Sequence, residues 1–526
     1  MGGPGVLWSS PQPSAVSAAL RALADTYTVA MGRPAAAWRT WLDSVDRRLY
    51  RAGMALTATA GVDGGAETLQ LCGPDGMVVT AGPDTGRWPR LLGGLPAELR
   101  PRLEPVLGVR ALLPVVRVSG SSVSGRLLDA EGKTVLRLVY ERPAAIAGSP
   151  ARLPGGLRLV PLRGYATAAV RAGRIVQGAG LVRADRSDYA AALAAAGVDP
   201  VGTDPPVLRP ELPADAAVAS VLLSFLDEMD AVRDGTIDDV DIEFLHDFRV
   251  AVRRSRSVVR LLGDLLPADL VAWVTPELKW LGDLTASSRD LDVHLEEFPS
   301  LAAGVSSGRP EDLAPMAVRL RRLRASERRR LVRGLRSPRY ERWRDRWRTD
   351  LAELAGRDGD RPTVQEISTE RLAGAYRRVL RRGARITPAS PAEALHDLRK
   401  RCKELRYLLE IFAPVLDPDG ARAAVKELKV LQDVLGRFQD SEAQREAIYA
   451  LAADMMASGD AEVGTILAMG EIAARQQEAM HTARAEFAAA FASFGRLPVG
   501  RRLARLTPAP TGAALPAGPA TVGAAR

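Results

Sequence analysis

The segment Leu245-His-Asp-Phe-Arg249 returns 150 positions later as Leu395-His-Asp-Leu-Arg399 and so uses two of the four histidines of the chain. The same offset, without a gap, aligns further residues: Arg253 with Lys403, Arg256 with Arg406, Glu277-Leu-Lys279 with Glu427-Leu-Lys429, Leu281 with Leu431, Asp283 with Asp433, and Asp290 with Asp440. Self-similarity at a fixed offset indicates copies of one structural unit. We therefore predict two related helical units in this part of the chain.

Helical geometry explains why the repeated basic residues would act together. At 100° per residue, His246 and the arginines at 249, 253, 256 and 260 share a stripe 80° wide. The second copy repeats this stripe with His396, Arg399, Lys403 and Arg406, and Glu410 ends the row. An apolar face beside the first stripe would dock the helix: Leu245, Phe248, Val252, Val259 and Leu262. Like charges one turn apart repel, so we expect an anion between the rows; the alternative is an ordinary solvated face.

Length, composition and charge limit the class of protein. The 526 residues predict two to four domains, and 47% apolar residues suffice for their cores. Two cysteines 330 positions apart exclude a disulfide framework, and the absence of 18 consecutive apolar residues favours a cytoplasmic protein without a membrane partner. Residues 1–240 carry 25 basic and 24 acidic side chains, against 47 and 39 in the remainder. The basic excess in the second half predicts an acidic polymer as partner.

The two halves of the chain also differ in pattern. Short β-rich runs between Gly and Pro, such as 111–118 and 133–140, predict an α+β first half. Apolar residues three and four apart predict an all-helical second half. The expected organisation is an N-terminal extension (1–19), an α+β domain (20–199), a Pro-rich linker (200–214), a helical domain (215–505) with repeats near 215–350 and 365–500, and a disordered tail (506–526).

The repeated His-Asp-x-Arg helix, followed each time by Leu-Lys-x-Leu-x-Asp, resembles the CHAD family over about 215–500. The resemblance implies a pair of pseudo-symmetric helical bundles around a basic channel that binds inorganic polyphosphate, with docking to polyphosphate granules. The polyphosphate-binding residues that it implies, including three with less certain facing (Arg254, Arg260 and Arg437), are His246, Arg249, Arg253, Arg254, Arg256, Arg260, Lys279, Arg289, His396, Arg399, Lys400, Lys403, Arg406, Lys426, Lys429 and Arg437.

The chemistry of that ligand fits these side chains independently of the resemblance. Polyphosphate offers regularly spaced negative charge and no base to read, so its site needs spaced cations. Arginine forks can hold two oxygens at once, and lysines supply point charges. A histidine among these cations would bind the polyanion with proton uptake. No nucleophile, catalytic carboxylate pair, metal cluster or cofactor motif accompanies the rows, so we predict a binding protein and not an enzyme.

The segments 46–56 and 127–138, with short strands between them, are similar to the CYTH family of triphosphate tunnel enzymes. That resemblance implies an antiparallel β tunnel or barrel. The sequence departs from the family's opening Glu-x-Glu-x-Lys motif, because its first glutamate is Glu67 and Lys133 is its sole lysine before residue 240. We therefore expect an inactive tunnel domain.

Two alternative functions stay open at this point. One is a divergent CYTH-type inorganic triphosphatase. The other is a nucleic-acid binder that uses residues 319–348, which hold 14 arginines with Tyr340, Trp343 and Trp347 between them. We consider the second less favoured, because aromatic side chains in such a segment more often pack inward against a solvated helix pair. The oligomeric state and the preferred polyphosphate chain length do not follow from the sequence.

Overall fold

The computed structural model describes residues 5–9, 12–62, 64–184, 187–199, 208–305, 309–357, 359 and 361–506. The chain forms two compact units: a sheet unit of residues 1–204 with 234–244, and a helical unit of residues 205–233 with 245–526. Residues 200–207 of the expected linker and 507–526 of the expected tail lie outside the described residues. Within the described ranges, no helix is both long and apolar enough to cross a membrane.

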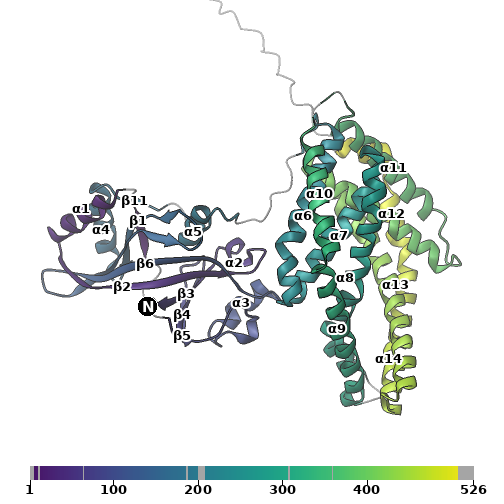
Figure 1. Cartoon of the computed structure of the whole chain (residues 1–526), viewed down its shortest axis with the longest axis horizontal. Helices are drawn as coiled ribbons and strands as arrows, with labels where there is room; N and C mark the ends of the chain where they lie inside the picture. Colours follow the sequence, from purple (N-terminus) through teal and green to yellow (C-terminus); the bar gives the residue numbers. More distant parts are fainter. Residues whose placement is uncertain are drawn as a thin grey trace, which may run out of the picture. The chain divides into compact units, whose positions relative to one another are not determined.

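The sheet unit is built on one antiparallel sheet, which confirms the α+β prediction (Figure 1). Its main path runs in the order β11-β1-β10-β7-β6-β2-β3-β4-β5, with β8 and β9 attached to β6. The strands are β1 (Val6–Ser9), β2 (Thr28–Asp43), β3 (Ala55–Gly61), β4 (Glu67–Cys72), β5 (Val78–Asp84), β6 (Leu113–Leu128), β7 (Thr134–Glu141), β8 (Ala144–Ile146), β9 (Arg152–Leu153), β10 (Gly156–Pro161) and β11 (Val182–Arg183).

The long pair β2 and β6 forms the middle of this sheet, and the sheet curves around an interior. Breaks in the β2–β6 register lie between Met31 and Pro34 and between Trp41 and Leu42, and such irregularities bend a sheet. Strands from both ends of the order, β1 and β10 on one side and β3, β4 and β5 on the other, line the same cavity. The sheet must therefore wrap around that cavity, in agreement with the predicted tunnel.

Helices pack against the sheet of this unit. They are α1 (Pro13–Ala24), α2 (Arg48–Arg51), α3 (Arg100–Leu107), α4 (Ala166–Gly178) and α5 (Asp188–Ala196), with the 3-10 turn η1 (Leu92–Gly94). Buried residues of α1 and α4, among them Leu23 and Val176, pack with Leu136 and Leu157 of the sheet. The segment 1–19 that was expected to be an extension contributes β1, which pairs with β10. The ordered sheet thus begins before residue 20.

The second half is all-helical, as predicted. Its helices are α6 (Ala214–Asp238), α7 (Ile242–Leu262), α8 (Ala268–Ala303), α9 (Ala314–Leu335), α10 (Pro338–Ala355), α11 (Val364–Gly383), α12 (Ala392–Ile411), α13 (Pro418–Ser458), α14 (Val463–Gly495) and α15 (Val499–Leu506), with the 3-10 turns η2 (Gly263–Leu265), η3 (Pro310–Leu313) and η4 (Ala413–Val415). Pro299 lies inside the last turns of α8.

Element boundaries in the helical unit repeat at the offset of 150 residues. The pairs α6 and α11, α7 and α12, η2 and η4, and α8 and α13 all begin 150 positions apart. The two copies also join symmetrically, because the amide of Ala214 donates to the carbonyl of Pro362 and the amide of Val364 donates to that of Leu212, each at 2.9 Å. These reciprocal hydrogen bonds flank the bridge between Pro213 and Thr363. The repeat is therefore a pseudo-twofold pair of helical copies.

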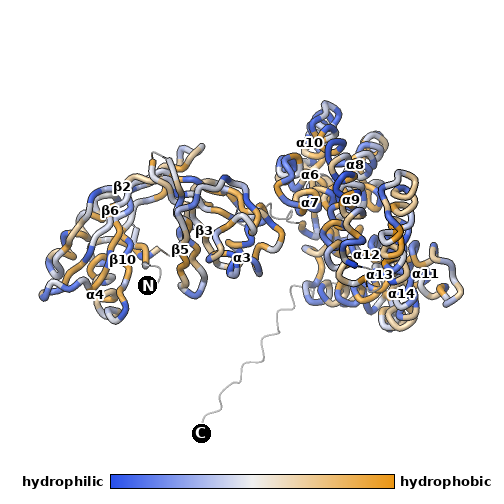
Figure 2. Tube along the Cα trace, turned by 90° about the horizontal axis from the view of Figure 1, so that it is seen from below, coloured by the Kyte–Doolittle hydropathy of each residue, from blue (hydrophilic) through white to orange (hydrophobic). Residues whose placement is uncertain are grey.

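The apolar faces predicted from the helical spacing are buried. Leu245, Phe248, Val252, Val259 and Leu262 of α7 are all at most 6% exposed. Figure 2 shows hydrophilic and hydrophobic residues alternating along the helices of this unit, as expected of helices with one face in a core. This burial fixes the rotation of α7 and α12, and it therefore decides where their basic stripes point.

Candidate functional site

A cavity of about 510 Å³ in the helical unit collects basic side chains from both copies. Helix α7 contributes Arg253 and Arg254, α12 contributes Arg399, Lys403 and Arg406, and α13 contributes Arg437. Three acidic side chains, Glu410, Asp433 and Asp440, also line it, with Val250, Tyr407, Gln432 and Gly436. Basic groups outnumber acidic ones two to one, so the cavity suits an anion.

Arg253 and Lys403, which are equivalent in the two copies, are the central pair of this cavity. Neither has an ion-pair partner within the part of the chain that the structure describes. Burial, together with the positive charges of Arg399 and Arg253, lowers the pKa of Lys403 to about 8, and Asp440 only partly opposes this effect. The repeat has thus brought two cations together without neutralising them.

The basic row extends beyond the cavity into the first copy. Burial lowers the pKa of Arg249, and the charges of Arg253, Arg256 and Arg289 lower it further, against the opposing effect of Asp290. Arg253 therefore acts electrostatically on both Arg249 and Lys403. Arg253 of the first copy thus links the charges of Arg249 and of Lys403 of the second copy.

Each copy holds its first arginine with an equivalent carboxylate. Arg249 Nη2 lies 3.9 Å from Asp290 Oδ1, and Arg399 Nη2 lies 3.1 Å from Asp440 Oδ1, 150 positions later. Arg399 also donates to Gln439 Oε1 at 2.5 Å, whereas Arg249 donates to the carbonyl of Gly282 at 3.4 Å. Asp290 and Asp440 are mostly exposed, so these pairs orient the guanidinium groups without burying them.

At one pair of equivalent positions, a basic residue in one copy corresponds to an acidic residue in the other. Arg260 of the first copy lies 3.3 Å from Glu404 of the second, and Glu404 is 3% exposed. The positions equivalent to this pair are Glu410 and Arg254, and both line the cavity. Arg260 is therefore held by a buried carboxylate, as is Arg401 at 2.8 Å from the same group. Of the residues predicted to bind the anion, Arg260 is one that the structure pairs internally.

Other predicted residues also have acidic partners. His396 Nε2 lies 2.6 Å from Glu442 Oε2 of α13, and His396 is not among the residues that line the cavity. Lys279 donates to Asp283 at 2.9 Å, and Arg437 pairs with Glu486. His396 was expected to face the anion; in the structure its imidazole lies beside a carboxylate of the neighbouring helix and outside the cavity lining.

The remaining predicted residues lie along the same helices. His246 and Arg289 are half-buried on α7 and α8, and the side chain of Arg256 lies against Gly282. Lys400, Lys426 and Lys429 are exposed on α12 and α13. The structure thus gathers Arg253, Arg254, Arg399, Lys403, Arg406 and Arg437 around the cavity, while these three lysines lie outside its lining.

The arginine-rich segment 319–348 folds as α9 and α10, with its aromatic residues inside. Tyr340, Trp343 and Trp347 are at most 2% exposed. Several of its arginines pair with acids of neighbouring helices, as Arg324 does with Asp292 at 2.5 Å and Arg348 with Asp227 at 2.7 Å. The segment offers no stacking aromatic side chain to a nucleic acid, which agrees with the packed helix pair that we favoured.

Tyr407, Gln432 and the acidic partners of the arginines were missed as site residues. Tyr407 follows Arg406 at a position where the first copy has Ser257, so the repeat comparison could not select it. The pairing of Arg399 with Asp440 could have been found, because both arginines have an aspartate 41 positions later. Among the described residues, no group of three or more His, Cys, Asp or Glu side chains is placed to hold a metal ion.

Comparison with known proteins places this site in a family context. The model of the CHAD domain matches residues 220–449. An uncharacterized protein of Mycobacterium tuberculosis strain H37Rv is 32% identical over 213 residues, which is 38% of this chain. A counterpart in strain CDC 1551 is 31% identical over the same length. The alignment spans 39% of the length of each of these relatives.

Solved structures similar to the chain fall into two groups. The CHAD domain of the plant Ricinus communis covers 56% of this chain and 96% of its own, at 25% identity and a TM-score of 0.48. PptA from Streptomyces chartreusis covers 53% of this chain and 100% of its own, at 19% identity and a TM-score of 0.43. A Hippeastrum protein described as having a dominant triphosphatase activity covers 38% and 97%, at 14% identity and a TM-score of 0.26.

The lowered pKa of Lys403 predicts a gain in stability when its charge is removed. At pH 7 Lys403 is still charged in the folded protein, although its burial and two neighbouring arginines disfavour the charge. Lys403→Met removes this unfavourable charge and should therefore raise the free energy of unfolding. Above pH 8 the folded wild type loses the proton while the unfolded chain keeps it up to about 10.4. Wild-type stability should therefore rise between these values, and the advantage of the variant should shrink. Denaturant titrations at pH 7 and 9.5 measure both effects.

Lys429→Met is the matched control, since Lys429 is exposed and outside the cavity. It should change stability little at either pH. A loss of stability in Lys403→Met at pH 7 would contradict the electrostatic account of this cavity.

Proposed function

We propose, from the premise that residues 220–449 carry a CHAD domain, that the cavity between α7, α12 and α13 binds inorganic polyphosphate. The observation that carries the proposal is the pair Arg253 and Lys403. Equivalent residues of two copies meet in one cavity, where neither is neutralised by a protein carboxylate among the described residues. A polyanion would supply the missing negative charge.

The shape of the basic row supports a linear ligand. The charges of Arg253, Arg256 and Arg289 all act on Arg249, and Arg399 and Arg406 line the cavity together with Lys403. A single compact anion would contact only part of such a row. A chain of phosphates, with a charge at each unit, would contact successive cations along it.

The types of side chain match phosphate oxygens. Arginine donates through a planar fork that can hold two oxygens, and lysine donates from a flexible stem. Asp440 and Gln439 hold the Arg399 guanidinium in place, so less side-chain freedom is lost on binding. Exposed Lys400, Lys426 and Lys429 would extend the attraction for the polymer outside the cavity, as they would for docking to a polyphosphate granule.

We further propose that the chain binds and does not hydrolyse its ligand. In the sheet unit, Glu141 and Asp188, the acidic side chains that line its two cavities, are both paired with arginine. Carboxylates held in this way have their charge already compensated. A divergent triphosphatase is the competing function, and phosphate release tests it directly.

Truncation of the central cations should weaken polyphosphate binding. Arg253→Ala, Arg399→Ala and Lys403→Ala should each cost about 1 to 3 kcal/mol, the range for charge-assisted hydrogen bonds. Each should also flatten the dependence of affinity on salt, because fewer counterions are released. Binding isotherms with polyphosphate of defined length, repeated across salt concentrations, measure both quantities.

Arg422→Ala is the control, because Arg422 lies on α13, exposed and paired with Asp419, away from the cavity. It should leave affinity and salt slope unchanged. Equal losses in all four variants would indicate nonspecific attraction. Full competition by single-stranded RNA at matched charge would favour the nucleic-acid function instead.

Polyphosphate affinity should also fall as the pH rises above 8. Lys403 titrates near 8 in the free protein, and a bound anion would raise that pKa, so binding above pH 8 takes up a proton. The affinity should therefore decrease by up to about tenfold per pH unit in this range. Lys403→Arg keeps the charge and should remove this dependence while retaining affinity at pH 7. Calorimetry at pH 8.5 in two buffers of different ionisation enthalpy counts the protons. Equal proton uptake in the variant and the wild type would contradict this assignment.

Hydrolysis should be absent when tripolyphosphate is supplied with Mg²⁺ or Mn²⁺. The measurement is phosphate release by the full chain, compared with the same chain bearing Glu141→Gln. Sustained turnover that is lost in this variant would support the triphosphatase function and overturn the proposal of a binding protein.

A further inference from the structure

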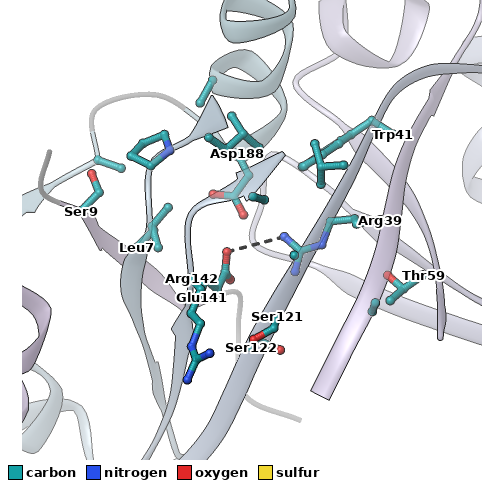
Figure 3. A pocket seen from close by; sticks show the side chains of 18 of the residues that line it. Leu7, Ser9, Arg39, Trp41, Thr59, Ser121, Ser122, Glu141, Arg142 and Asp188 are labelled. Atoms are coloured by element: carbon teal, nitrogen blue, oxygen red, sulfur yellow. Dashed lines mark ion pairs between the residues drawn. The ribbon is translucent and has the colours of Figure 1, made fainter. Parts of the chain in front are cut away.

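The sheet unit contains an interior space that the polyphosphate site does not use. Two cavities of about 320 and 450 Å³ share Leu7, Arg39, Trp41, Ala184 and Asp188 and therefore adjoin. Figure 3 shows the first of them, with Arg39, Glu141 and Asp188 pointing toward one another. Volumes of this size are typical of sites for small molecules.

The space exists because two inward positions of β2 carry the short side chains of Ala35 and Ala37. Residues two apart on a strand face the same side, and the lining residues of β2 are Ala35, Ala37, Arg39 and Trp41. Strand β6 faces them with Val118, Gly120 and Ser122. Leu7, Leu153 and Pro154 complete an apolar wall beside Trp41. A wall of this composition favours an organic body over a string of phosphates.

Most charge in the space is already compensated. Glu141 lies 2.9 Å from Arg158 and 3.7 Å from Arg39, and Arg158 also pairs with Asp188. These partners lower the pKa of Glu141 although its burial acts in the opposite direction. A network of paired charges cannot neutralise the several negative charges of a triphosphate.

Arg39 is the exception within this network. Its ion pair with Glu141 is too long for a full hydrogen bond, and its side chain is 34% exposed toward the cavity. A guanidinium with unused donors beside an apolar wall is the sign of an anionic group missing from the protein.

We propose that the sheet unit binds a small amphipathic organic monoanion. Its carboxylate or sulfonate would accept hydrogen bonds from Arg39, and its apolar body would lie against Trp41, Ala37 and Leu153. Arg158 is held by two carboxylates, and Arg142 and Arg183 of the lining are exposed, so Arg39 is the inner arginine that would receive the charge of the anion. This makes the sheet unit a receptor for a ligand that is chemically unlike polyphosphate.

A matched pair of probes tests the charge and the apolar contact separately. The anion 8-anilinonaphthalene-1-sulfonate and the neutral N-phenyl-1-naphthylamine share their rings and differ in the sulfonate, and both fluoresce on entering an apolar site. Titration of the full chain should show saturable binding of the anion, displaced by decanoate and not by tripolyphosphate. Displacement by tripolyphosphate at concentrations similar to decanoate would overturn the proposal.

Two variants assign the binding to this cavity. Arg39→Gln should weaken the anionic probe about tenfold, the loss of one charge-assisted contact, and leave the neutral probe within about twofold. Ala37→Leu fills the space and should weaken both probes. Arg137→Ala, an exposed arginine of β7 outside both cavities, should change neither.

The variants also define the outcomes that would refute the site. If Arg39→Gln affects both probes equally, the arginine does not receive the anion, and if Ala37→Leu affects neither, the probes bind elsewhere. Should Ala37→Leu fail to fold, as seen by its circular dichroism, the ratio of the two probe affinities in Arg39→Gln still decides the question, because only a direct contact changes one probe and not the other.

Discussion

The helical unit depends on holding like charges together against their mutual repulsion. Arg253, Arg399 and Lys403 lie close enough for burial and their combined field to lower the pKa of Lys403 to about 8. Such an arrangement is unfavourable in an isolated helix. It persists because the apolar faces of α7 and α12 are buried elsewhere, so the hydrophobic packing fixes the rotation of both helices and the basic stripes have no freedom to separate. The packing of the hydrophobic core therefore determines where these basic side chains lie.

The two units differ in how completely their interior charges are paired. In the sheet unit each buried arginine near the cavity has a carboxylate, and Arg158 has two. In the helical unit the buried carboxylate Glu404 serves Arg401 and Arg260 at the edge of the row, while Arg253 and Lys403 receive none within the described ranges. The helical cavity therefore keeps two cations without a paired carboxylate in the part of the chain that the structure describes, whereas Arg158 of the sheet unit has two.

Much of this arrangement could be predicted from the repeat. Two aligned segments located α7, α8, α12 and α13, and the helical period placed the arginines on one stripe beside a buried face. The helical period could not show which neighbouring helix lies opposite a given side chain. His396 shares the stripe with Arg399, yet Glu442 of α13 holds it, and Arg260 is held by Glu404 of the other copy. Similarly, the missing Glu-x-Glu-x-Lys motif indicated what the sheet unit lacks, while its cavity arises from Ala35 and Ala37, which carry no motif.

The reciprocal hydrogen bonds beside Pro213 and Thr363 tie together two copies that belong to a single polypeptide. In a homodimer with the same fold, every substitution would occur twice, once on each side of the axis. Fusion into one chain removes that restriction, as the replacement of Arg260 by its equivalent Glu410 illustrates. One copy can therefore evolve a different affinity from the other without losing the shared architecture. The two ends of the site then differ, so the molecule can distinguish the two directions along it.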